Sequence, residues 1–105
     1  MDLYIYIDVK NNSVNDDQVW SDNQCYAVYR ALCQFEGKNI NQSNPEIDNF
    51  LKQQCKGTSF SISHEYHSSD KRTLNEVTDE ASNLCQLLED ECADVGLVVS
   101  MSSSV

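Results

Sequence analysis

The chain is poor in glycine, proline and basic side chains. Its 105 residues include 3 glycines, 1 proline and 7 Lys or Arg against 17 Asp or Glu, which gives a formal net charge of −10. With 40% hydrophobic residues and so little glycine and proline, the composition is that of a globular protein, and its length predicts a single domain over residues 1–105. The shortage of Lys and Arg argues against direct binding to nucleic acid or to an anionic membrane, which both attract cationic side chains.

Long apolar runs are also absent. The longest aliphatic run is Leu97–Val99, which is far too short to cross a bilayer. The first residues have neither the basic nor the apolar part of a signal peptide, so we expect a cytoplasmic protein. Its 5 cysteines are odd in number and contain no CxxC pair, which predicts reduced thiols that pack as small core side chains.

Motifs of known chemistry are missing as well. The sequence has no glycine-rich phosphate loop, no GxSxG elbow and no calcium-loop spacing. The run His64–His67 (HEYH) is one residue shorter than HExxH, and on a strand its two histidines would point to opposite faces. A cysteine and a histidine could still meet in space, but nothing in the local sequence activates a thiol. We therefore expect no enzyme, no catalytic residue, no metal and no other cofactor.

Hydrophobic periodicity and capping signals predict three strands and three helices. Ser21, Asn44 and Thr73 are typical helix caps, and a glycine follows each predicted helix. The expected order is a strand at 3–9, a loop at 11–17, helices at 22–36 and 45–56, a strand at 58–66, a helix at 74–95, a strand at 97–101 and a frayed tail at 102–105.

This β-α-α-β-α-β order predicts an α+β or α/β fold. We expect a small sheet of about three strands, with the helices packed mainly on one face. One side of the strand at 58–66 is nearly all serine, so we expect that side to face water. The strand order stays open, because both parallel and antiparallel pairing fit the lengths of the connections.

Acidic residues concentrate in the last third of the chain. Residues 73–105 have no Lys or Arg but contain seven acids, which are Glu76, Asp79, Glu80, Glu89, Asp90, Glu91 and Asp94. The last four lie near the C-terminal end of the predicted helix, where the helix dipole is already negative and each acid costs about 0.3–1 kcal/mol. A helix selected for stability alone would carry Lys or Arg there. We therefore predict that these acids form a surface for a basic partner.

A second acidic group surrounds an aromatic residue. Asp16, Asp17 and Asp22 flank Trp20, and Tyr26 follows one helical turn later. Aromatic side chains beside carboxylates are typical of binding hot spots, so we include the three aspartates and Trp20 among the predicted partner contacts. The alternative interpretation is that Trp20 packs in the core as a helix staple.

In its small size, acidity, reduced thiols and lack of catalytic motifs, the chain resembles the immunity proteins that bacteria carry against their own polymorphic or contact-dependent toxins, many of which are nucleases. The resemblance implies a cytoplasmic inhibitor that neutralises a basic toxin, such as a nuclease domain, without binding nucleic acid or membranes. Two alternatives stay open. One is a DNA mimic that blocks a restriction or other defence system, and the other is a non-catalytic adaptor whose charge serves solubility.

Overall fold

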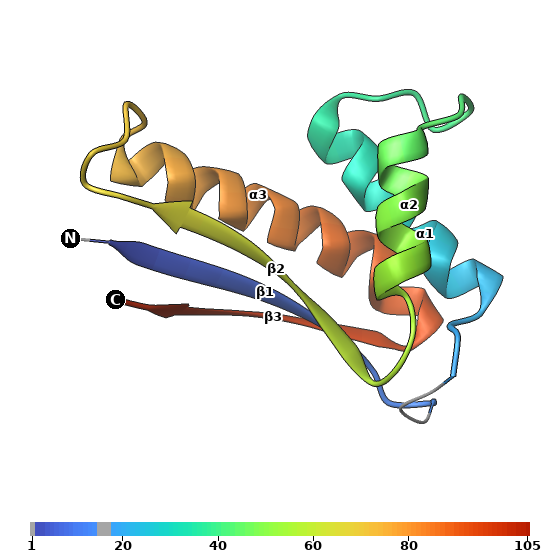
Figure 1. Cartoon of the computed structure of the whole chain (residues 1–105). Coiled ribbons are helices and arrows are strands. Elements are labelled where there is room, and N and C mark those ends of the chain that lie inside the picture. Colours follow the sequence, from blue (N-terminus) through green and yellow to red (C-terminus); the bar gives the residue numbers. More distant parts are fainter. Residues whose placement is uncertain (1, 15–17) are drawn as a thin grey trace.

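The computed structural model describes residues 2–14 and 18–105. The elements along the chain (Figure 1) are β1 (Leu3–Asn11), α1 (Asp22–Glu36), α2 (Pro45–Gln54), β2 (Ser59–Tyr66), α3 (Leu74–Cys92), the short 3₁₀ helix η1 (Ala93–Val95) and β3 (Leu97–Ser104). The predicted β-α-α-β-α-β order is confirmed, and the fold is α+β.

The three strands form one antiparallel sheet in the order β2-β1-β3. β1 is central, because Ile7 lies opposite Ile62 of β2 on one side and Met101 of β3 on the other. The two edge strands therefore run parallel to each other on either side of β1, and α3 connects them. The pairing that the sequence left open is thus antiparallel throughout.

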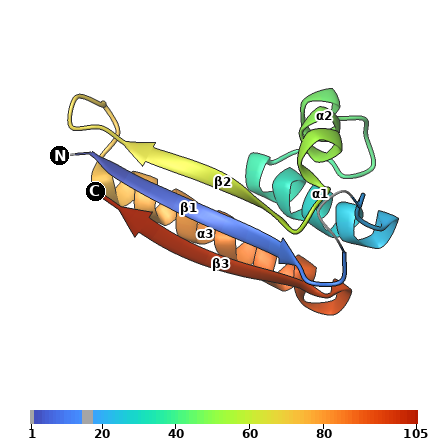
Figure 2. The ribbon, with the colours of Figure 1, turned by 60° about the horizontal axis from the view of Figure 1, so that its bottom comes forward.

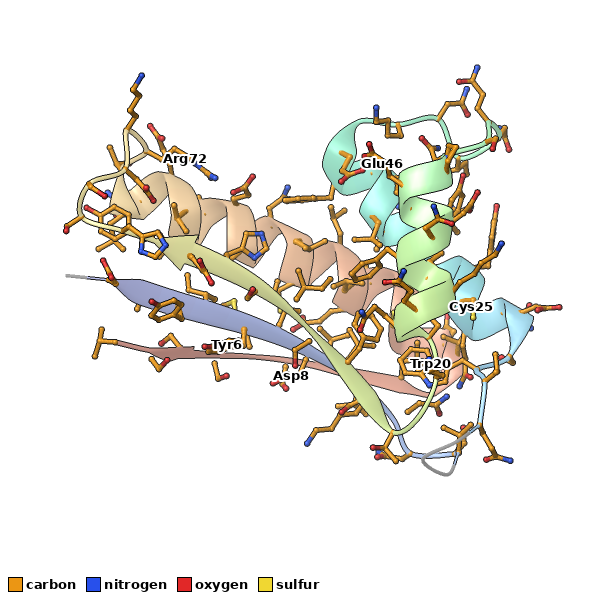
Figure 3. The ribbon with its side chains drawn as sticks, viewed as in Figure 1. Tyr6, Asp8, Trp20, Cys25, Glu46 and Arg72 are labelled. Atoms are coloured by element: carbon orange, nitrogen blue, oxygen red, sulfur yellow. The ribbon has the colours of Figure 1, made fainter. Side chains whose placement is uncertain are left out.

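The helices cover one face of this sheet (Figures 1 and 2). α3 runs along the length of the sheet, whereas α1 and α2 lie over one end. Ile5, Ile7 and Val9 point to the covered face and are at most 5% exposed. The alternate residues of β1 point to the open face, where Ser61 of β2 donates a hydrogen bond to Asp8 (Figure 3). The serine-rich side of β2 faces water, as predicted.

The cysteine thiols are free and mostly buried. Cys33, Cys55, Cys85 and Cys92 are buried, and Cys25 is half-buried. Burial raises the pKa of Cys55 to about 12 and that of Cys92 to about 11, so neither thiol ionises near neutral pH. The predicted role of the cysteines as small core side chains is confirmed for the four buried ones.

The helix starts follow the predicted capping chemistry. The Ser21 hydroxyl accepts from the Gln24 N–H at 3.3 Å, and the Gln24 side chain accepts from the Ser21 N–H at 3.1 Å. Thr73 and Glu76 form the same reciprocal pair at the start of α3, at 3.1 and 3.3 Å. Each pair satisfies two backbone donors that a helix start otherwise leaves unbonded.

The ends of two strands differ from the prediction. β1 continues to Asn11, which was predicted as loop, because its N–H donates to the Thr58 carbonyl at 2.8 Å and its amide is fully buried. β3 continues through Ser104, which lies opposite Tyr4. The predicted tail at 102–105 is therefore wrong as far as Ser104, because pairing with β1 overrides the weak strand preference of a serine run.

Two helices are shorter than predicted. α2 ends at Gln54, and Cys55 caps it by donating its N–H to the Leu51 carbonyl at 2.8 Å. α3 ends at Cys92, and the next three residues tighten into η1 before Gly96 takes a left-handed conformation with φ 76°. Asp94 therefore lies beyond α3 and not in its last turn.

Candidate functional site

Most of the acidic residues predicted on the last helix lie toward one side of it. At about 100° per residue, Asp79 and Asp90 point away from the core and lie about 16 Å apart along the helix axis. Glu80 and Glu91 lie on the flank that faces Arg72 and Arg30. Glu76 lies between this flank and the solvent side, and Glu89 lies on the opposite flank. Asp94 is exposed in η1. Five of the six acids of α3 therefore lie within an arc of about 120°, from the solvent side of the helix to the flank beside α1 and β2, and Glu89 lies apart from them.

Two of these acids already have basic partners within the chain. Glu91 accepts from the Arg30 Nε of α1 at 2.9 Å and from the Gln34 amide at 2.9 Å. Glu80 pairs with Arg72, which precedes α3. Neither arginine lies within residues 73–105, so the local sequence could not reveal these pairs. Glu80 and Glu91 are less available to a partner than the sequence suggested.

The other acids of α3 differ in what they contact. Glu76 closes the capping box, Asp90 accepts from the Gln86 amide at 2.9 Å, and Glu89 lies 3.5 Å from the Cys85 thiol. Asp79 and Asp90 are exposed. These residues supply negative charge to the surface, but none of them lines one of the hollows around α2 described below.

A groove between α1 and α2 combines carboxylates with aromatic rings. Its volume is about 290 Å³, and its lining residues are Asp22, Cys25, Tyr26, Tyr29, Asp48 and Leu51. The rings of Tyr26 and Tyr29 stack with centroids 6.1 Å apart. The Arg30 guanidinium lies 5.7 Å from the centroid of the Tyr26 ring, so this ring already has a cation of the same chain beside it.

The groove continues along α2. An adjoining hollow of about 330 Å³ shares Cys25, Asp48 and Leu51 with it and adds Val19, Lys52 and Cys55. Val19 is 75% exposed and Tyr26 is 49% exposed, so both side chains are accessible at this surface. We call this surface, formed by Val19, Asp22, Tyr26, Tyr29, Asp48 and Leu51, the α1–α2 groove.

Local structure explains why the acidic and aromatic residues of the groove are stable in their positions. Asp22 and Asp48 lie in the first turns of α1 and α2, where the helix dipole favours negative charge. Tyr29 is fixed because its hydroxyl donates to the Gln42 carbonyl at 2.9 Å. The groove therefore carries its carboxylates without a local cost to stability.

Of the described residues in the second acidic group, Asp22 lies at this groove and Trp20 does not. Trp20 is 3% exposed, its Nε1 donates to the Gly57 carbonyl at 2.8 Å, and its ring packs 5.4 Å from that of Phe60 (Figure 3). The prediction of Trp20 as a partner contact is wrong, because the side chain belongs to the core, as the alternative interpretation had it. Asp16 and Asp17 lie outside the described residues.

A second hollow lies on the other side of α2. It measures about 250 Å³ and is lined by Leu32, Phe35, Glu36, Glu46, Ile47, Phe50, Ile62, His64 and Leu84. His64 packs edge-on against Phe35, and its buried Nδ1 has no hydrogen-bond partner among the described residues. Carboxylates thus line hollows on both sides of α2.

The two histidines of the HEYH run are in different surroundings. Burial lowers the pKa of His64, whereas hydrogen bonds to Asp2 and then to Glu65 raise the pKa of His67. In residues 2–14 and 18–105, no three His, Cys, Asp or Glu side chains come close enough together to hold a metal ion.

Sequence reasoning did not identify Tyr29, Asp48 or Leu51 as site residues. Tyr26 and Tyr29 are one helical turn apart, which was the available local signal. Asp48 and Leu51 reach the groove only through the packing of α2 on α1, which no sequence pattern specifies. The prediction from sequence singled out acids that oppose the helix dipole. Asp48 was not among them, because it lies in the first turn of α2, where the dipole favours negative charge.

Comparisons of the chain with protein-family models, with curated proteins and with solved structures gave no match. Among the described helices, none combines the length and the apolar character needed to span a membrane. The function must therefore be inferred from the chemistry of the α1–α2 groove.

Proposed function

We propose that this protein is a non-catalytic inhibitor that binds a basic partner protein and neutralises it, as an immunity protein neutralises a toxin nuclease. The observation that supports this most is the α1–α2 groove, in which Asp22 and Asp48 line the same hollow as two stacked tyrosines and Leu51. The apolar stem of a lysine or arginine packs on the rings while its charged head meets a carboxylate.

The groove has the composition of a binding hot spot. Hot spots are enriched in tyrosine and lie in hollows where water is excluded around a few contacts. A cation on an aromatic ring contributes about 0.5–1 kcal/mol when exposed and about 2 kcal/mol or more when desolvated. Several such contacts along the groove would hold a basic surface.

The remaining acids have a different role in this proposal. A net charge of −10 creates a long-range field that accelerates the approach of a basic partner. Exposed acids such as Asp79 and Asp90 contribute to that field without entering the contact. The acids of α3 fall into two groups, at 76–80 and 89–91, with none between them, and this uneven spacing gives no phosphate-like row, so the DNA-mimic alternative gains no support.

The proposal is tested by cellular protection. The protein encoded next to this gene is expressed with and without this chain, and growth is measured. We expect the neighbour to be toxic alone and harmless with this chain. Asp22→Lys/Asp48→Lys should abolish protection. The matched control Asp79→Lys/Asp90→Lys changes the net charge equally on α3 and should retain protection.

Two outcomes would contradict the proposal. The first is a neighbouring protein that is harmless or does not bind this chain. The second is loss of protection by the α3 variant while the groove variant still protects. Circular dichroism of both variants establishes that each is folded.

A further inference from the structure

β3 is an edge strand that carries no charge. Residues 95–105 contain no Asp, Glu, Lys, Arg, His or Pro, although the chain as a whole has a net charge of −10. In the part of the chain that the structure describes, β3 pairs with β1 alone. Val98 is 51% exposed and Met101 is 46% exposed. A long edge of this kind presents unpaired backbone donors and acceptors to another strand.

The other edge of the same sheet is protected. β2 carries Glu65, and His67 follows it directly. Charged side chains are a common means of preventing edge-to-edge pairing. β3 has neither charges nor a bulge, since its residues pair one-to-one with β1 from Leu97 to Ser104. The two edges therefore differ in their readiness to accept a further strand.

We propose that β3 pairs antiparallel with β3 of a second copy of this chain, so that two sheets join into one of six strands. An uncharged edge gives a basic partner nothing to recognise, whereas a second uncharged edge approaches it without local repulsion. Antiparallel self-pairing also satisfies the two-fold symmetry of most dimers.

The sequence of β3 is complementary to itself. With the two-fold axis at Ser100, Val99 lies opposite Met101 of the second copy on the helix-covered side, and this apolar pair occurs twice. On the open side, Val98 lies opposite Ser102 and Ser100 lies opposite its own copy. No like charges meet in this register.

The structure also leaves room beside this edge. A groove of about 220 Å³ is lined by Leu3, Ile5, Thr78, Ser82, Met101, Ser102 and Ser103. The small side chains of Thr78 and Ser82 make its α3 wall, and Leu3, Ile5 and Met101 make it partly apolar. Val99 of the second copy, placed opposite Met101, would point toward this groove.

Dimerisation at β3 is separate from the proposed partner contact. Figure 2 shows β3 on the edge of the sheet away from α2, and none of its residues belongs to the α1–α2 groove. The two contacts should respond to salt in opposite ways. Salt screens the repulsion between two chains of charge −10 and strengthens the dimer, but it weakens binding of a basic partner.

Sedimentation equilibrium of the full chain tests the dimer. We expect a concentration-dependent shift to twice the monomer mass, with a dissociation constant that falls as salt rises. Ser100→Lys/Ser102→Lys places lysines near one another across the two-fold axis and should raise this constant at least about tenfold.

The matched control is Ser61→Lys/Ser63→Lys on β2. These two serines of β2 pair with Asp8 and Tyr6 of β1, and Ser100 and Ser102 of β3 pair with the same two residues. The two variants therefore replace the same residue type on the same face of the sheet and change the charge equally. This variant should still dimerise. A wild-type chain that stays monomeric up to about 1 mM, which corresponds to about 4 kcal/mol of binding, would overturn the proposal. Equal dissociation of the two folded variants would also overturn it.

Hydrogen exchange of the wild-type chain provides a test that needs no variant. The outward amides of residues 97–104 should become protected as the protein concentration rises. Protection in β2 in place of β3 would show that the wrong edge had been chosen.

Discussion

His64 and His67 have opposite effects on how stability depends on pH. Burial lowers the pKa of His64 below its ordinary value of 6.5, so the unfolded chain binds more protons than the folded one. Stability contributed by His64 is therefore present above pH 6.5 and is lost as the pH falls. The raised pKa of His67 acts in the other direction, because its stabilisation is present at low pH and is lost as the pH rises through its folded value.

Urea unfolding between about pH 5 and 8 separates the two histidines. In His64→Phe, the loss of stability just below pH 6.5 should become smaller than in the wild type. In His67→Gln, the same loss should become larger, because the compensating histidine is absent. Parallel pH profiles of stability for the two variants would show that burial does not lower the pKa of His64 and that the Asp2 contact does not raise the pKa of His67.

Neutralising two neighbouring acids of α3 should change the stability of the fold in opposite directions. Glu91 is paired with Arg30, and the two side chains are 23% and 39% exposed, so Glu91→Gln should destabilise the fold by about 0.2–1 kcal/mol. Asp90 lies near the negative end of the helix and forms no ion pair within residues 2–14 and 18–105, so Asp90→Asn should stabilise by about 0.3–1 kcal/mol. Thermal unfolding at low salt measures both. Equal shifts in the same direction would contradict the assignment.

At the scale of the element, Gln24 joins three parts of the fold. Its side chain caps α1, exchanges hydrogen bonds with the buried Asn11 amide of β1 at 2.9 and 3.3 Å, and donates to the Val95 carbonyl of η1 at 3.0 Å. This buried polar group is therefore a structural connection between the end of the central strand and two helical segments.

Removal of this side chain should be costly. Gln24→Leu leaves the Asn11 amide and the Val95 carbonyl without their partners, and we expect a loss of about 1–3 kcal/mol. Asn11→Leu/Gln24→Leu should lose less than the sum of the single variants, because both partners of the pair are then gone. Urea unfolding of the four proteins measures this, and strict additivity would contradict the proposed coupling.

Helix starts and strand existence could be predicted because they depend on nearby residues. The pairs Ser21–Gln24 and Thr73–Glu76 are local, so their chemistry is readable from the sequence. The end of β3 was not readable, because Ser102–Ser104 are held only by their pairing with β1. Asn11 was assigned to a loop for the same reason, since its partners Thr58 and Gln24 are distant in the sequence.

At the scale of the whole molecule, the sequence correctly indicated an excess of negative charge. It did not predict which carboxylates line a common groove. The acids near the end of α3 drew attention because they oppose the helix dipole, yet the structure pairs two acids of this helix, Glu80 and Glu91, with arginines. Asp48 was not predicted as a site residue, because negative charge is favourable in the first turn of a helix. Its position opposite Asp22 and Tyr26 depends on how α2 packs on α1.

The affinity for the protein encoded next to this gene tests the proposed role of the α1–α2 groove most directly. Calorimetry compares the wild type with Asp22→Lys/Asp48→Lys and Asp79→Lys/Asp90→Lys. Loss of hot-spot contacts should weaken binding of the groove variant by at least about 30-fold, which corresponds to about 2 kcal/mol. The α3 variant should stay within about tenfold of the wild type, since distant charges mainly change the rate of association. An α3 variant that loses binding while the groove variant keeps it would contradict the groove as the site of recognition.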